Sequence, residues 1–229
     1  MPAKNSRKQY QANGYYHIYN RGVEKRIIFL DKQDYNVFLS YFKDYLLKKD
    51  TQGLQEQLLD KTLTPKEKDK ILKQLRLNNF AEQITMLAYC LMPNHFHFFV
   101  KQTETNSIDA FMNSLGTRYT MYFNKKYQRV GSLYQGVYKA VAVTTEEQFL
   151  HLSRYIHRQA LTLQGEALQE RQPCSYPEYI GTRNTEWVDP NDVLAYFSRT
   201  NPQLTYKSFV LQDDSGSCPL LKTFTIENC

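Results

Sequence analysis

Residues 92–100 constrain the fold more strongly than any other stretch of the chain. A proline-asparagine pair at their start favours a turn, and the aromatic and β-branched residues that follow favour a strand. Residues 83–91, before the turn, are also strand-like, so the two segments are predicted to form an antiparallel hairpin. Because side chains alternate between the faces of a strand, His95 and His97 are expected on one face and Phe96 on the other.

Hydrophobic periodicity and capping signals predict the remaining elements. Strands are predicted over residues 15–20 and 137–143. Before the hairpin, one helix begins at the N-cap Asp31 and carries an apolar stripe to Leu46, and a short helix runs from Pro65 to about Arg76 behind a capping box at Thr64 and Glu67. After the hairpin, a long helix is capped by Ser107, another runs from a capping box at residues 144–147 to about Leu163, and a short helix lies near residues 189–197. Residues 1–13 are expected to form a disordered basic arm.

The order strand, helix, strand, strand, helix, strand is the split βαβ pattern of a ferredoxin-like sheet. We therefore expect an α+β fold with an antiparallel sheet, with the strands that adjoin each helix side by side and both helices on one face. The helix over residues 144–163 is expected to pack beyond this unit. One domain is predicted over residues 14–165, with a solvated helical insertion at about 48–80. Residues 166–229 are predicted to pack on that domain as a C-terminal extension with a flexible tail.

Composition points to a globular protein of a reducing compartment. Of the 229 residues, 41% are hydrophobic and 23% are charged, which are ordinary values for a soluble protein. No apolar run approaches the length of a membrane span, and the N-terminus lacks the pattern of a secretory signal. The four cysteines are too widely separated for a zinc site or a dense disulfide framework, and Cys90 is expected to be a buried thiol. A cytoplasmic protein with no membrane partner is expected.

The charge balance and the aromatic content are compatible with a nucleic-acid partner. The net charge is +6, and the chain contains 18 tyrosines and 13 phenylalanines. Aromatic rings beside lysine and arginine suit a surface that stacks unpaired bases and follows phosphates, although most of these aromatics are expected in the core.

Four residues could form a site for phosphate chemistry. Two imidazoles at alternate strand positions, His95 and His97, can bind one metal ion, although the same pattern also occurs on the wet face of ordinary sheets. Tyr155 and Gln159 lie one turn apart on the flank of the apolar stripe of their helix. Two imidazoles and an amide oxygen suit Mg²⁺ or Mn²⁺ acting on phosphate. The charge of the metal would favour the phenolate form of the tyrosine, whose reference pKa is about 10.

These residues resemble the HUH single-tyrosine transposases, and especially the REP-associated tyrosine transposases of bacteria. The resemblance covers about residues 14–180 and rests on Tyr16-His17-Ile18, Asn20-Arg21-Gly22, the stretch from Met92 to His97, residues 118–124, residues 131–136 and Arg154-Tyr155-Ile156. It implies that His95 and His97 bind the metal, with Gln159 as the third ligand. It also implies that Tyr155 is the nucleophile that becomes linked to a 5′ phosphate. REP-associated members have asparagine and proline where this chain has Gln159-Ala160, so the glutamine resembles the insertion-sequence branch.

The expected function is that of a metal-dependent endonuclease and strand transferase acting on single-stranded DNA at hairpin-forming sites. A monomer and a homodimer are both compatible with the family. The expected DNA contacts are Arg21, Arg118, Lys125, Lys126, Arg129, Tyr134 and Lys139. For the charges on the long helix, the competing interpretation is a solvated helix end.

Two other functions remain open: a replication initiator or relaxase of the same chemistry, and a non-catalytic nucleic-acid-binding module on the same sheet. Among the tyrosines, Tyr119, Tyr134 and Tyr138 compete with Tyr155 for the role of nucleophile. Tyr119 is more easily explained as core, Tyr134 as a base-stacking loop residue, and Tyr138 as a strand residue without a nearby ligand. His17 is expected to be a packed strand residue rather than a ligand.

Overall fold

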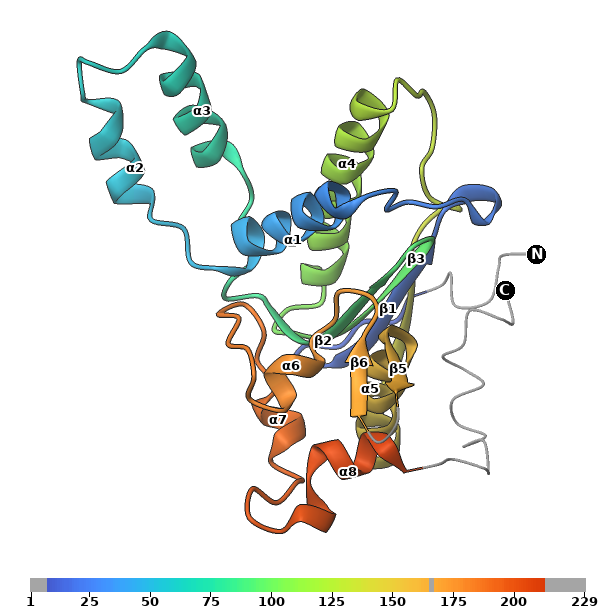
Figure 1. Cartoon of the computed structure of the whole chain (residues 1–229). Helices are drawn as coiled ribbons and strands as arrows, with labels where there is room; N and C mark the ends of the chain where they lie inside the picture. Colours follow the sequence, from blue (N-terminus) through green and yellow to red (C-terminus); the bar gives the residue numbers. More distant parts are fainter. Residues whose placement is uncertain (1–7, 165–166, 213–229) are drawn as a thin grey trace.

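The computed structural model describes residues 8–164 and 167–212 (Figure 1). In chain order the elements are β1 (Tyr15–Arg21), the 3₁₀ turn η1 (Val23–Lys25), α1 (Lys32–Leu46), α2 (Thr51–Leu58), α3 (Pro65–Arg76), β2 (Ile84–Met92), β3 (His95–Gln102), α4 (Ser107–Lys126), β4 (Lys139–Val143), α5 (Glu146–Ala160), β5 (Leu161–Gln164), β6 (Ala167–Glu170), α6 (Tyr176–Tyr179), α7 (Asn191–Leu194), the 3₁₀ turn η2 (Pro202–Leu204) and α8 (Tyr206–Leu211).

Four strands form an antiparallel sheet in the order β2-β3-β1-β4. The predicted α+β fold with a split βαβ antiparallel sheet is therefore confirmed, including the β2–β3 hairpin. The expectation that the strands adjoining each helix lie side by side is wrong. Each helical crossover passes over one strand, so β3 separates β1 from β2, and β1 separates β3 from β4. The two central strands are thus β1 and β3.

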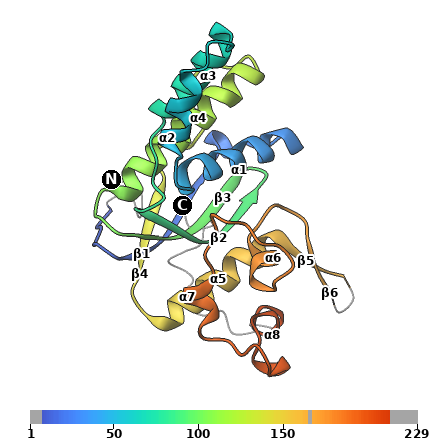
Figure 2. The same cartoon turned by 90° about the vertical axis from the view of Figure 1, so that its left-hand side faces the viewer.

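Helices cover both faces of this sheet (Figures 1 and 2). On one face, α1 and α4 enclose an aromatic core to which the sheet contributes Ile18, Phe96 and Phe98. On the other face, α5 packs on Ala88, Phe99 and neighbouring strand residues, and the segment from α6 to α8 closes over the far side of α5. Alternation along β3 sends Phe96 and Phe98 to one core and Phe99 to the other, which explains why both faces are apolar.

The insertion between α1 and β2 projects from the body of the molecule as the pair α2 and α3 (Figure 1). The predicted helix α3 is present with its capping box, in which Thr64 and Glu67 bond each other's backbone N–H groups. Helix α2 was not predicted. The two ends of the insertion meet where the Phe80 N–H donates to the Tyr45 carbonyl at 2.7 Å. The amide of Asn79 closes the same base by donating to the Leu47 carbonyl at 2.6 Å.

Several local expectations are corrected by tertiary contacts. Residues 8–13 do not form a disordered arm, because Lys8 pairs with Asp109 at 2.7 Å on α4; residues 1–7 lie outside the described residues. The N-cap of α4 is Asn106, and Ser107 lies in the first turn of the helix. Helix α5 ends at Ala160, because the chain continues as the β5–β6 hairpin.

Other expectations are confirmed or refined. Asp31 caps α1 through its side chain. The N-cap of α5 is Thr145, one residue later than predicted, and its side chain accepts from the Gln148 N–H. The predicted capping box is not formed, because the Gln148 side chain accepts from the Thr144 N–H instead. Cys90, as expected, and Cys174 are buried cysteines. Within the part of the chain that the structure describes, none of the helices is both long enough and apolar enough to span a bilayer.

Candidate metal and nucleophile site

Strands β1 and β3 place three histidines on the sheet face that α5 covers. His97 lies opposite Tyr19, and His17 lies opposite Phe99, so these residues share the face whose core includes Phe99. His95 follows on the same face, two residues before His97. The predicted placement of His95 and His97 on one face, with Phe96 in the opposite core, is therefore what the sheet shows.

His17 and His97 are joined by a buried hydrogen bond. His17 Nε2 lies 2.8 Å from His97 Nδ1, and both side chains are fully buried. The ring centroids are 5.0 Å apart and the ring planes are inclined by 15°. Because the two nitrogens are much closer together than the ring centres, the rings meet edge to edge. The other nitrogen of His97, Nε2, is buried and has no hydrogen-bond partner among the described residues.

Burial keeps these imidazoles neutral. It lowers the pKa of His17 to about 3. Burial also lowers the pKa of His95 to about 4, with a smaller contribution from the positive charge of Arg21. The pKa of His97 lies well below its usual value, first because of burial and then because of the neighbouring His17 and His95. A neutral imidazole carries a lone pair on one nitrogen, which is the form that binds metal ions.

Tyr155 of α5 lies against this pair of histidines. Its ring meets His97 edge-on, with centroids 5.4 Å apart and planes at 84°, and it meets His17 in the same way at 6.2 Å. The tyrosine is half-buried, because it lies on the flank of the apolar stripe through Leu152 and Ile156. Gln159 follows one helical turn later and is also half-buried. The described contacts join Tyr155, rather than Gln159, to the histidines.

The far side of α5 is fixed by a buried polar cluster. His157 Nδ1 lies 2.6 Å from the Tyr206 hydroxyl, and His157 Nε2 lies 2.8 Å from the Ser175 hydroxyl. The Tyr206 hydroxyl donates to Ser153 at 3.2 Å, and Arg154 donates to the Phe209 carbonyl at 3.3 Å. These bonds tie α5 to α8 and to the start of α6. The direction of Tyr155 is therefore set by the layers on both sides of its helix.

The competing tyrosines all lie on the opposite face. Tyr119 donates to the Ile28 carbonyl at 2.6 Å, and Tyr138 donates to Asp109. The hydroxyl of Tyr134 is buried without a partner, although this residue was expected to stack bases from an open loop. Burial raises the pKa of each of the three hydroxyls. All three residues belong to or pack against the core beneath α1 and α4.

The structure divides the predicted DNA-binding cations into two groups. Arg21 lies opposite His95, and Lys139 lies opposite Tyr19, so both belong to the face that carries the histidines. Arg118, Lys125, Lys126 and Arg129 lie on or just after α4, which covers the other face.

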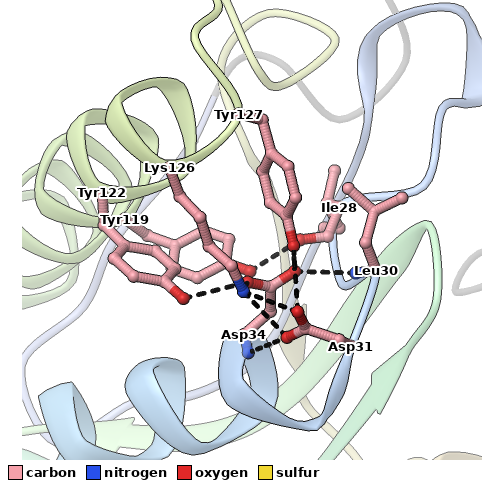
Figure 3. A network of polar contacts seen from close by, with 8 residues as sticks. All are labelled: Ile28, Leu30, Asp31, Asp34, Tyr119, Tyr122, Lys126 and Tyr127. Atoms are coloured by element: carbon pink, nitrogen blue, oxygen red, sulfur yellow. Dashed lines mark hydrogen bonds and ion pairs between the residues drawn. The ribbon is translucent and has the colours of Figure 1, made fainter.

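Two cations of the α4 group are neutralised within the protein. Lys126 donates to the fully buried Asp34 at 2.8 Å and to Asp31 at 2.7 Å (Figure 3). Arg118 pairs with Asp44 at 2.7 Å and lies over the ring of Tyr41. Lys126 and Arg118 were expected to contact DNA, and their charges are balanced by neighbouring carboxylates.

Asp34 organises a wider network around Lys126 (Figure 3). It accepts hydrogen bonds from the Leu30 N–H at 2.8 Å, from Tyr122 at 3.0 Å and from Tyr127 at 2.8 Å. The network joins the start of α1 to the end of α4 and is part of the support of the fold. Lys125 is exposed, and half-buried Arg129 donates to Asn124 at 3.2 Å. These two cations are available at the surface.

His17 is the residue of the site that the sequence did not reveal. It was expected to be a packed residue, and it is packed, but its partner is a candidate metal ligand. The sequence signal for this role was that His17 lies on the same strand face as Tyr19 and Arg21. Only the pairing register of β1 with β3 shows that this face meets His97.

A metal site at these histidines would need donor atoms beyond histidine, cysteine and carboxylate side chains. Among the described residues, no group of three or more histidine, cysteine or carboxylate side chains is placed to hold a metal. The unpartnered Nε2 of His97 is nevertheless a buried donor atom that suits a ligand. A metal here would bind few protein atoms and would complete its coordination with an amide and with substrate or water oxygens. The residues fit such an open site.

The comparison with known families supports the transposase resemblance over part of the chain. Residues 57–159 match the family model described as "Transposase IS200 like". Among solved structures, a REP-associated tyrosine transposase bound to a REP hairpin has a TM-score of 0.46 at 9% identity, covering 82% of this chain and 98% of that chain. A candidate transposase from Deinococcus radiodurans R1 has a TM-score of 0.27 at 14% identity, covering 69% of this chain and 98% of that chain. No curated protein matches the chain. The family match thus makes residues 57–159 similar to the IS200-like transposases.

Proposed function

We propose that this protein is a metal-dependent endonuclease and strand transferase that acts on single-stranded DNA through a 5′-phosphotyrosine intermediate. The similarity of residues 57–159 to a transposase family supports an enzyme that processes DNA. The observation that carries the finer proposal is the contact of Tyr155 with His97, whose Nε2 is buried without a partner. The ring of Tyr155, the proposed nucleophile, is thus adjacent to the ring of His97, whose Nε2 is the proposed ligand atom, on the side of the sheet that α5 covers.

We assign the metal ligands to His95 and His97, with the amide oxygen of Gln159 as a third donor from α5. A mixed nitrogen and oxygen set without thiolate suits Mg²⁺ or Mn²⁺. When bound, the ion would offset the charge of the phosphate and favour the phenolate form of Tyr155.

In the cleavage step, the Tyr155 hydroxyl oxygen forms a bond to the phosphorus of a DNA phosphodiester. The bond from phosphorus to the 3′ oxygen breaks, and the proton lost by the phenol is balanced by the proton gained by that oxygen. One strand then ends in a free 3′ hydroxyl, and the other is linked to Tyr155 through its 5′ phosphate. A 3′ hydroxyl can attack this ester and rejoin strands without a nucleotide cofactor.

The DNA partner is proposed to be a single strand with a hairpin, held by cations of the histidine face. Arg21 of β1 pairs with His95 of β3, and Lys139 of β4 pairs with Tyr19, which in turn pairs with His97 of β3. A phosphate beside the histidines would therefore meet positive charge from two strands. Lys125 and Arg129 remain candidates for a more distant contact with the backbone.

The test is incubation with labelled single-stranded hairpins in Mg²⁺ or Mn²⁺, followed by detection of covalent protein–DNA adducts. The Tyr155→Phe variant keeps the ring and should fold but form no adduct. Tyr35→Phe removes a hydroxyl from another half-buried tyrosine, on α1, and should retain the adduct. Adduct formation by Tyr155→Phe, or equal cleavage in excess chelator, would refute the proposal.

The non-catalytic alternative makes a different prediction for the same assays. A binding module would retain DNA after His95→Ala or His97→Ala and would show no metal-dependent adduct. If the wild-type protein binds single strands without forming any adduct, the sheet is a binding surface and the catalytic proposal fails.

A further inference from the structure

The segment Tyr16-His17-Ile18 contains one polar residue whose burial needs an explanation. Tyr16 and Ile18 belong to the core beneath α1 and α4, whereas His17 points to the other face. His17 is fully buried and is hydrogen-bonded to His97 at 2.8 Å. A buried imidazole costs folding free energy unless its nitrogens are used. The bond to His97 is the use that one nitrogen of His17 finds, and it affects where His97 carries its own hydrogen.

Whether Nδ1 of His97 donates or accepts in this bond decides whether Nε2 of His97 has a lone pair for a metal ion. A hydrogen bond between two neutral imidazoles needs one N–H and one lone pair. If His17 Nε2 donates, His97 carries its hydrogen on Nε2 and has no lone pair there. If His97 Nδ1 donates, His17 Nε2 accepts and the lone pair of His97 lies on Nε2. Only the second arrangement leaves the buried, unpartnered Nε2 able to bind a metal ion.

His17 is poorly placed to be a ligand itself. Its Nε2 is directed at His97 Nδ1, and the described residues contain no cluster of three histidines arranged around one ion. A ligating histidine commonly uses its second nitrogen for a hydrogen bond that fixes the ring and its tautomer. His17 provides this bond from the neighbouring strand, so that the orientation of His97 is set by the pairing of β1 with β3.

We propose that His17 is a positioning residue, which accepts a hydrogen bond from His97 Nδ1–H and thereby presents the lone pair of His97 Nε2 to the metal ion. This inference rests on the proposed function, because the metal is assigned there to His95 and His97. It adds a residue from β1 to the machinery and a defined tautomer for His97.

The ring of His17 also supports the nucleophile, since Tyr155 meets it edge-on at 6.2 Å. Test variants must therefore keep the volume of the side chain. His17→Phe keeps a ring and removes both nitrogens. His17→Gln offers an amide oxygen that can accept the bond from His97. Tyr16→Phe is the matched control, because it removes a partly buried hydrogen bond on the same strand but on the opposite face.

The first measurement is Mn²⁺ affinity by electron paramagnetic resonance, without DNA. His17→Phe should weaken Mn²⁺ binding by about 10- to 100-fold, as is typical when an orienting partner of a ligand is lost. His17→Gln should restore most of the affinity, and Tyr16→Phe should leave it unchanged. A side chain needed only for packing would give equal affinities in the two His17 variants.

The second measurement is the tautomer of His97 in the metal-free protein, by long-range proton–nitrogen NMR of labelled histidines. The wild-type protein should show His97 protonated on Nδ1, and His17→Phe should shift the proton toward Nε2. Wild-type protonation on Nε2 would overturn the inference, even if a variant fails to fold. If the wild-type protein binds no Mn²⁺, or His95→Ala binds it equally well, the proposed function fails, whereas the tautomer result still decides the role of His17.

Discussion

Arg21 lies directly opposite His95 across the pairing of β1 with β3, so a guanidinium and an imidazole share one corner of the histidine face. Across the same sheet, Lys139 lies opposite Tyr19, which is the strand neighbour of His97. The cations nearest to the proposed chemistry therefore come from strands. This placement separates them from the larger group of cations on α4.

The two groups of cations should differ in how they affect DNA binding. Replacing Arg21 and Lys139 by glutamine should weaken single-strand binding and lower the slope of log affinity against log salt by about 0.7 for each lost phosphate contact. Arg118→Gln is the control, because its charge is already balanced by Asp44. Binding titrations at several salt concentrations check this. An unchanged slope in the double variant would place the phosphates elsewhere.

The buried network around Asp34 should contribute strongly to stability. Asp34→Asn removes the charge that Lys126 meets and leaves hydroxyl donors without a full acceptor, so it should cost about 2 kcal/mol of unfolding free energy. Asp31→Asn removes the exposed partner of the same lysine but keeps a good N-cap, so it should lower the unfolding free energy by less than Asp34→Asn does. Urea unfolding of both variants measures the difference. Equal costs would mean that burial of Asp34 does not matter.

Acid should weaken the contact between the N-terminal segment and α4. Burial alone would raise the pKa of Asp109, but the Lys8 ammonium and the Tyr138 hydroxyl outweigh it and lower this pKa. Because the folded pKa is below the unfolded value of about 3.9, the stabilisation is present above that pH and is lost as the pH falls through the folded pKa.

Asp109→Asn should therefore be less stable than the wild-type protein at pH 7, by less than about 1 kcal/mol for this partly exposed pair. The gap in stability between the two proteins should narrow as the pH falls below about 3.9. Urea unfolding at pH 7 and in acid measures this gap, and a gap that widens in acid would contradict the assignment.

The nucleophile and the histidines should act within one chain. Helix α5 is tied to Ser175 by His157, and Ser175 accepts from the Tyr89 N–H of β2 at 2.9 Å, so moving α5 and the segment after it to a second chain would break a buried bond to the sheet. A mixture of Tyr155→Phe and His95→Ala proteins should therefore form no adduct. Adduct formation by the mixture, with neither variant active alone, would show that the helix is exchanged between chains.

Local signals explain why much of the fold could be predicted. The capping box at Thr64 and Glu67 and the alternation of His95, Phe96 and His97 depend on neighbouring residues, so the sequence contains them in full. The strand order was harder to predict, because the sequence of a helical crossover does not reveal which strand the helix passes over. The expected adjacency of β1 and β2 was wrong for that reason.

The parts of the site that could not be predicted depend on distant pairs. Lys126 was predicted to contact DNA, because none of its neighbours in the sequence indicates that Asp34, at the start of another helix, forms an ion pair with it. In the same way, His17 became part of the site only through the register that brings it to His97. The role of Tyr155 and the DNA contacts remain predictions, which the adduct and salt experiments address.

The closed base of the α2–α3 insertion has a consequence for the tolerance of the fold to changes in chain length. Because the Phe80 N–H bonds the Tyr45 carbonyl, the chain leaves and re-enters the body at nearly the same point. The entropy of closing such an excursion changes only slowly with its length. A short glycine-serine bridge in place of residues 50–77 would thus leave the strand register, and the spacing of the histidines, as they are. This position is a natural place for a chain of this architecture to gain or lose sequence without disturbing its chemistry.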